Sequence, residues 1–201
     1  MKPLPKILLA LTAVAALSLF SVQLAQAYSV TLEQVGSDVV ATGSGPLDLT
    51  GLTLVVTYAS LPAQIFPVLG QIVTGSGGAT DGYQGSISGP TSFGGVFFTF
   101  ASSGSGDSVG IFRDTSTLLV PSGYVSGTAL SDSATYNNAT FASLGVTPGT
   151  YVWTWGAGAN QNFTLVIGAA GVPDGGSTVS LLGFGLLGLT ALRGNWVAKA
   201  A

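Results

Sequence analysis

The chain has 201 residues and a formal net charge of −3, and only 6% of its residues are charged, with no cysteine and no histidine. So few cations exclude an electrostatic nucleic-acid surface, and the missing cysteines exclude a small scaffold held by disulfides. Without histidine and cysteine the chain also lacks histidine-dependent triads and the usual zinc and iron ligands, so we expect no metal ion and no cofactor.

The first 27 residues have the pattern of a secretory signal peptide. Lys2 and Lys6 precede an apolar stretch over residues 7–20, and a small-residue A-x-A site follows before residue 28. An N-terminal core helix is the alternative, but such a helix normally has a polar face and an N-cap, which this stretch lacks. We therefore predict that signal peptidase removes residues 1–27, and the residues around this cleavage are Ala25, Ala27 and Tyr28.

The mature chain is rich in Thr, Val, Ser, Gly and aromatic residues, a composition typical of β-sheets. Its first part alternates apolar and polar residues with the period of strands that bury one face. Predicted strands cover residues 28–35, 39–42 and 52–58, with turns at 36–38 and 43–46, and we expect these three strands to form a meander. Residues 75–95 are rich in Gly, Ser and Thr, which predicts a loop with one brief strand near residues 83–87.

Two hairpins are predicted in the second half of the chain. One joins residues 95–101 to 108–112 across the turn 102–107, and the stronger one joins residues 151–155 to 162–167 across the loop 156–161. Short strands, Gly-rich connections and the lack of a convincing amphipathic helix predict one all-β domain over residues 28–171. We expect an antiparallel β-sandwich of jelly-roll type, flanked by a signal-peptide helix and a short C-terminal apolar helix.

Three aromatic residues of the second hairpin permit two interpretations. The aromatic residues that share one face of their strand are Tyr151, Trp153 and Trp155. They would stack over three apolar residues of the partner strand, which are Phe163, Leu165 and Ile167. Such a face is normally core, and this interpretation is favoured for Trp153. A row of exposed, coplanar rings would instead bind carbohydrate, and the candidate sugar-stacking residues are Tyr151 and Trp155.

Carboxylates are the remaining candidates for catalysis, because a glycosidase needs only two of them across a cleft. Those of the mature domain are Glu33, Asp38, Asp48, Asp81, Asp107, Asp114 and Asp132. Most lie beside Gly or Ser, where Asp commonly stabilises a turn, so we expect no catalytic residue and no enzyme. Loops at 78–81 and 103–107 offer oxygen ligands for calcium, but their spacing favours ordinary turns. N-glycosylation sequons occur at Asn138 and Asn162, and we assign no role to them.

Residues 172–201 form a predicted C-terminal sorting signal. A turn cluster precedes an apolar run over residues 178–192, and the cations that follow are Arg193 and Lys199. As a helix this run would be ~22 Å long against a hydrocarbon core of ~30 Å, which favours a temporary anchor that is later cut. The alternative is a last core helix, which three glycines and the missing polar face disfavour. The turn cluster consists of Val172, Pro173, Asp174, Gly175, Gly176 and Ser177.

This turn cluster resembles the PEP-CTERM sorting signal in its VPDSG variant, with Gly175 where that variant carries Ser. Members of the family usually end in a tight Arg cluster, whereas this chain has a single Arg193 and then Lys199. Residues 141–156 and 34–45 also resemble recurring segments of such proteins. The resemblance implies export, processing by an exosortase, transient contact with the inner membrane, and a place at the cell surface or in the extracellular matrix of a polysaccharide-secreting bacterium. It implies no catalytic residue.

Two classes of function follow from these residues. The first is a non-enzymatic surface or matrix protein with a structural or adhesive role, for which signal peptidase and an exosortase are the processing partners. The second is a lectin-like module that binds extracellular polysaccharide through exposed aromatic rings. An enzyme would require two carboxylates to converge in one cleft, and nucleic acid is not an expected partner.

Overall fold

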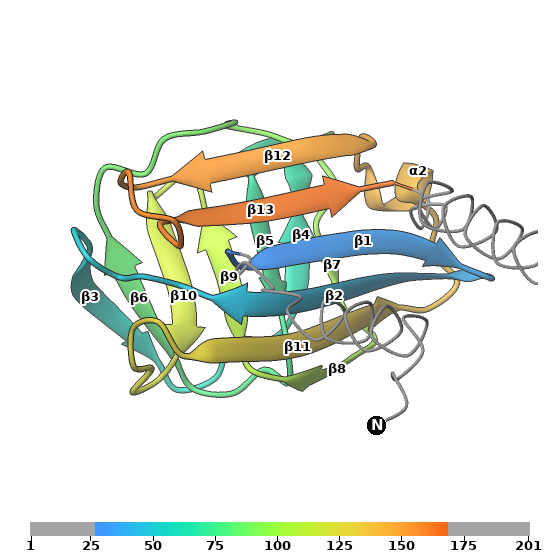
Figure 1. Ribbon diagram of the computed structural model, residues 1–201. Coiled ribbons are helices and arrows are strands. Elements are labelled where there is room, and N and C mark those ends of the chain that lie inside the picture. Colours follow the sequence, from blue (N-terminus) through green and yellow to red (C-terminus); the bar gives the residue numbers. More distant parts are fainter. Residues whose placement is uncertain (1–26, 169–201) are drawn as a thin grey trace, which may run out of the picture.

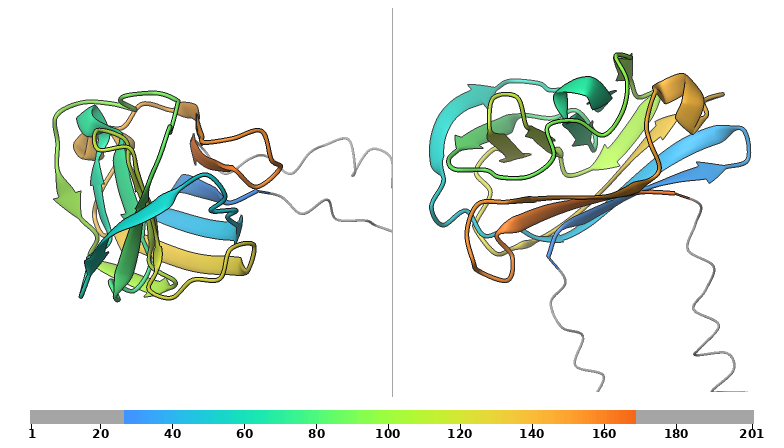
Figure 2. Two further views of the ribbon diagram at one scale, coloured as in Figure 1. Left: turned by 90° about the vertical axis from the view of Figure 1, so that its left-hand side faces the viewer. Right: turned by 90° about the horizontal axis from the view of Figure 1, so that it is seen from above.

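The computed structural model describes residues 27–168, so the two predicted terminal helices lie outside the described residues. Within this range the chain forms two β-sheets that lie face to face (Figures 1 and 2). Sheet A contains β1 (Ser29–Val35), β2 (Asp38–Pro46), β8 (Ser103–Gly106), β11 (Ala129–Tyr136), β12 (Gly149–Thr154) and β13 (Asn162–Ile167). Sheet B contains β3 (Thr53–Tyr58), β4 (Gln64–Phe66), β5 (Gln71–Thr74), β6 (Thr80–Gln84), β7 (Thr99–Phe100), β9 (Val109–Phe112) and β10 (Thr117–Pro121).

The strand order is β12-β13-β1-β2-β11-β8 in sheet A and β3-β6-β10-β9-β5-β4-β7 in sheet B. Neighbouring strands are antiparallel in both sheets, except that β1 runs parallel to β13. The all-β prediction is therefore confirmed, whereas jelly-roll connectivity is not confirmed by this order. Two short helical turns, η1 (Pro67–Leu69) and α2 (Phe141–Leu144), connect strands, and no helix between residues 27 and 168 is long and apolar enough to cross a bilayer.

The hydrophobic core fills the space between the two sheets. Strand β1 alternates as its sequence predicts, with Val30 and Leu32 pointing into this core. Sheet B contributes aliphatic side chains such as Ile72 and Ile111 from the opposite side. A second, smaller cluster lies on the other side of β10, where Leu119 packs against Leu61 and Val73. Burial of both faces explains why β10 reads as a continuous apolar run and not as an alternating one.

The stronger of the two predicted hairpins is confirmed. Strands β12 and β13 pair antiparallel, with Trp153 opposite Phe163 and Tyr151 opposite Leu165. The rings of Trp153 and Phe163 meet edge to face with centroids 5.9 Å apart, a favoured aromatic geometry. Of the predicted meander, the pairing of β1 with β2 is confirmed. The third strand is wrong as part of a meander, because β3 lies in sheet B and pairs with β6.

The other predicted hairpin, between residues 95–101 and 108–112, is wrong. Strand β7 pairs with β4, whereas β9 pairs with β5 and β10. Residues 103–106, predicted as the turn, form β8 at the edge of sheet A next to β11. Their Ser-Gly-Ser-Gly sequence carries no side chain large enough to mark a buried face, so the pattern resembles a turn. A Cβ on Gly104 would overlap the Gly75 carbonyl, which explains why glycine occupies this strand.

Candidate functional site

The predicted signal cleavage lies directly at the edge of the folded core. Ala25 falls outside the described residues, Ala27 is half-buried, and the Tyr28 side chain is completely buried. The backbone of Tyr28 is fixed as well, because its N–H donates to the Pro46 carbonyl and its carbonyl accepts from the Thr164 N–H. The predicted first residue of the mature chain is therefore an integral part of the fold.

The Tyr28 side chain joins the two sheets through a buried polar contact. Its hydroxyl donates to Oδ2 of Asp132 on β11, at 2.6 Å, and lies 3.4 Å from the Thr74 hydroxyl on β5. A Cβ on Gly43 would overlap both the Tyr28 hydroxyl and the Asp132 carboxylate, so glycine in β2 makes room for the pair. Burial is the main cause that raises the pKa of Tyr28, and the charge of the nearby Asp132 raises it further. Burial also raises the pKa of the Asp132 carboxyl.

The interpretation of the carboxylates as turn residues is confirmed for Asp48, whereas Asp81 lies within β6 and is buried, and its carboxylate accepts hydrogen bonds from the turn at residues 122–123. Asp48 accepts hydrogen bonds from the backbone and hydroxyl of Thr50, and Asp81 accepts one from the Gly123 N–H. These hydrogen bonds hold the pKa of each carboxyl below its ordinary value. Asp132 differs, because it lies within β11 and faces the core. Among residues 27–168, no group of three Asp, Glu, His or Cys side chains is arranged to hold a metal ion.

The aromatic residues of β12, and Trp155 directly after it, pack mainly inside the domain. Trp153 is completely buried and donates from Nε1 to the Pro90 carbonyl at 2.7 Å, as expected for a core residue. Trp155 is only 8% exposed and donates to the Asp48 carbonyl, also at 2.7 Å. Tyr151 is half-buried against Phe93. Solvent-exposed, coplanar rings are the condition for sugar stacking, and Trp155 does not meet it.

Sequence reasoning missed an exposed apolar surface formed by residues before and within β7. We call it the aromatic patch, and it consists of Val96, Phe97, Phe98 and Phe100, which are 74%, 54%, 46% and 55% exposed. The sequence predicts these residues as one arm of a hairpin, over residues 95–101, but only Thr99–Phe100 form a strand that pairs with a neighbour. Adjacent aromatic residues in a predicted strand are the signal that could have drawn attention to this surface.

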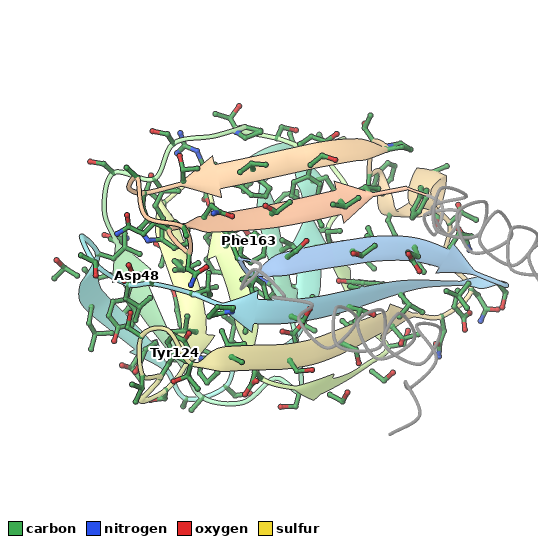
Figure 3. The ribbon with its side chains drawn as sticks, viewed as in Figure 1. Asp48, Tyr124 and Phe163 are labelled. Atoms are coloured by element: carbon green, nitrogen blue, oxygen red, sulfur yellow. The ribbon has the colours of Figure 1, made fainter. Side chains whose placement is uncertain are left out.

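The aromatic patch adjoins the end of the domain from which the chain leaves β13. The Gly95 N–H donates to the Gly145 carbonyl at 2.7 Å, just after α2, and a Cβ on Gly145 would meet the Phe97 ring. Gly149 then pairs with Ile167, the last residue of β13. Figure 1 shows α2 at the same end of the domain as the end of β13, and the view from above in Figure 2 separates the two across the thickness of the sandwich. Figure 3 shows Asp48 and Tyr124 at the other end of the domain.

The predicted sorting residues, from Val172 to Ser177 with Arg193 and Lys199, lie outside the described residues. Comparison with family models nevertheless finds residues 171–193 to match the VPDSG-CTERM motif. This match covers the turn cluster and the apolar run up to Arg193, and it is consistent with a PEP-CTERM-type sorting domain. The predicted resemblance is thereby confirmed. No curated protein and no solved structure matches the chain.

Proposed function

We propose that this protein is exported, held at the inner membrane for a time by residues 178–192, and placed at the cell surface or in the extracellular matrix after an exosortase has processed it. Its role there is structural or adhesive and not enzymatic. The VPDSG-CTERM match at residues 171–193 carries the proposal, because a C-terminal sorting motif has meaning only for a protein that leaves the cytoplasm.

The arrangement of the chain supports this proposal. The described strands run from Ser29 to Ile167, between the predicted signal cleavage and the sorting motif, so both ends can be cut without removing a strand. Val172 follows the last strand closely, which places the folded domain near the site of processing. The structural or adhesive role is supported by the few charged residues and by a sequence rich in Ser, Thr and Gly.

Intact mass spectrometry of the protein from cells and from medium tests the processing. We expect a mature mass that starts at Tyr28 and lacks the residues after the sorting motif, and a longer form in bacteria without exosortase. Asp174→Asn should also leave the longer form, whereas Asp114→Asn, at an exposed position outside the motif, should be processed normally. A mature mass that includes residues 173–201 would overturn the proposal.

The lectin-like alternative receives no support from the buried Trp155. Isothermal titration with the polysaccharide of the producing bacterium tests it directly. Heat of binding that persists in Trp155→Phe would locate a polysaccharide site elsewhere on the domain.

A further inference from the structure

The aromatic patch contains a cluster of rings in contact and not only scattered side chains. The Phe98 ring meets the rings of Phe66 and Phe100 edge to face, with centroids 5.5 Å and 4.8 Å apart. Val96 and Phe97 directly precede this cluster in the chain, and both are more than half exposed. Such a contiguous apolar patch commonly marks the contact with a protein, a ligand or a membrane.

The surroundings of the aromatic patch point to an uncharged, apolar partner. No Asp, Glu, Lys or Arg occurs between Gly82 and Gly106, so burial of this surface desolvates no charged side chain of the segment. Arg113 is the one basic residue within residues 27–168. Electrostatic attraction to phosphate groups is therefore weak, and the hydrophobic effect must supply the contact energy.

The length of chain beyond the domain indicates which apolar partner lies within reach. Nine residues, 169–177, separate Gly168 from the apolar run at residues 178–192. Even fully extended, nine residues span at most about 32 Å, at ~3.3–3.6 Å per residue. While residues 178–192 are in a bilayer, Gly168 is held within about this distance of the hydrocarbon core, and the end of the domain at which β13 ends stays near the membrane.

We propose that the aromatic patch inserts into the surface of the lipid bilayer to which the apolar run anchors the chain. This inference rests on the proposed function, because the anchor supplies the proximity. A tethered contact needs little intrinsic affinity, since the effective concentration of the bilayer at the patch is high. The contact orients the domain with α2 and the end of β13 toward the membrane, and it weakens once processing cuts the tether.

The cysteine-free sequence allows a direct test with single fluorescent labels. Val96→Cys places a label in the aromatic patch, and Val125→Cys is a matched control, because the two valines are 74% and 71% exposed. Val125 follows Tyr124, which Figure 3 shows at the end of the domain away from α2. Residues 28–201 contain every described strand, and this chain is reconstituted in phosphatidylcholine vesicles whose acyl chains carry a spin-label quencher.

We expect vesicles to shift the emission of the Val96 label to the blue and to quench it about twofold or more beyond the Val125 label, since interfacial residues lie ~5–10 Å deep. Added anionic lipid should not strengthen the quenching, because Arg113 is the one cation of the described domain. Phe97→Ser combined with Phe100→Ser should reduce quenching at Val96 while the protein still floats with the vesicles.

Flotation distinguishes failure of the anchor from failure of the contact. A protein that does not float overturns both the membrane segment of the proposed function and this inference. Flotation with equal quenching at Val96 and Val125 overturns only the inference. A blue-shifted Val96 label without vesicles also overturns the inference. If that shift depends on protein concentration, a second copy of the chain covers the aromatic patch. If it does not, the chain's own apolar run covers the patch.

Discussion

The Tyr28 hydroxyl donates a 2.6 Å hydrogen bond to Oδ2 of Asp132, although 104 positions separate the two residues. Both side chains are buried between the sheets, where water cannot replace a lost partner. The first residue predicted to remain after export is thereby connected to the middle of β11. The stability of the domain, its response to pH and its processing should all depend on this contact.

Removal of the Tyr28 hydroxyl should destabilise the domain. Tyr28→Phe leaves the Asp132 carboxyl buried without its donor, which should lower the free energy of unfolding by about 1–3 kcal/mol. Urea unfolding followed by tryptophan fluorescence measures this difference. Tyr136→Phe is a matched control, since the equally buried Tyr136 hydroxyl has no hydrogen-bond partner among the described residues and its removal should cost little. Equal losses in the two variants would contradict the prediction.

The contribution of Asp132 to stability should decrease as pH rises. Burial raises the pKa of the Asp132 carboxyl in the folded chain above the ordinary value of 3.8, so the folded state keeps this proton longer than the unfolded state. Where the folded state binds more protons, the free energy of unfolding falls with increasing pH. The contribution is fully present below the ordinary pKa and is lost as pH rises through the folded-state pKa.

Comparison with Asp132→Asn isolates this dependence, because the variant cannot titrate at position 132. Urea unfolding at a series of pH values should show the wild type losing stability relative to the variant from about pH 4 upward. Asp48 and Asp81, whose pKa values are lowered by hydrogen bonds, titrate in both proteins and cancel in the difference. A difference that is constant or grows with pH would exclude this role for Asp132.

A methyl group at position 43 should disrupt the same contact by steric overlap. Gly43→Ala places its Cβ against the Tyr28 hydroxyl and the Asp132 carboxylate, and overpacking of this kind costs about 1–3 kcal/mol. Gly78→Ala is the matched control, because its Cβ would approach no atom closer than 3.8 Å. Thermal unfolding should therefore show a clear loss for Gly43→Ala alone, and comparable losses in both would show that overlap is not the cause.

Signal peptide removal should precede folding of the domain. The peptidase must reach the bond between Ala27 and Tyr28, but in the folded chain Tyr28 is buried and β1 begins at the next residue. Full-length chain that has been folded in detergent should resist purified signal peptidase, whereas the unfolded chain should be cut. Gly43→Ala should restore cleavage in proportion to its loss of stability, and equally rapid cleavage of the stable wild type would rule out this order.

Local sequence patterns predict the hairpins and buried faces that depend on residues close together in the chain. The β12–β13 hairpin follows from two alternating strands on either side of a Gly-rich loop, and Trp153 from its place on the apolar face. Strand β8 escaped prediction because its Ser and Gly residues have no buried face, and its position depends on β11, far along the chain. The short strands β4 and β5 were missed because runs of three or four residues show no periodicity.

Among the candidate sites, a continuous motif could be predicted from the sequence, whereas sites formed by residues far apart in the chain could not. The sorting motif is a continuous stretch, so its residues could be recognised from the sequence, and the family match at residues 171–193 confirms this. Asp132 was interpreted as a turn residue because Ser131 and Ser133 flank it, yet its role depends on Tyr28. The aromatic patch was missed because alternation indicates which residues share a face and not whether another layer covers that face.

The position of β13 determines how the domain would respond to mechanical load. A protein held by its C-terminal end transmits tension from the anchor into Ile167, along the axis of β13. That strand is hydrogen-bonded to β12 on one side and to β1 on the other, so pulling shears two ladders at once and cannot peel a free edge. The last described strand is thus hydrogen-bonded on both sides, an arrangement that would resist flow or adhesion forces if the proposed C-terminal anchor holds the domain.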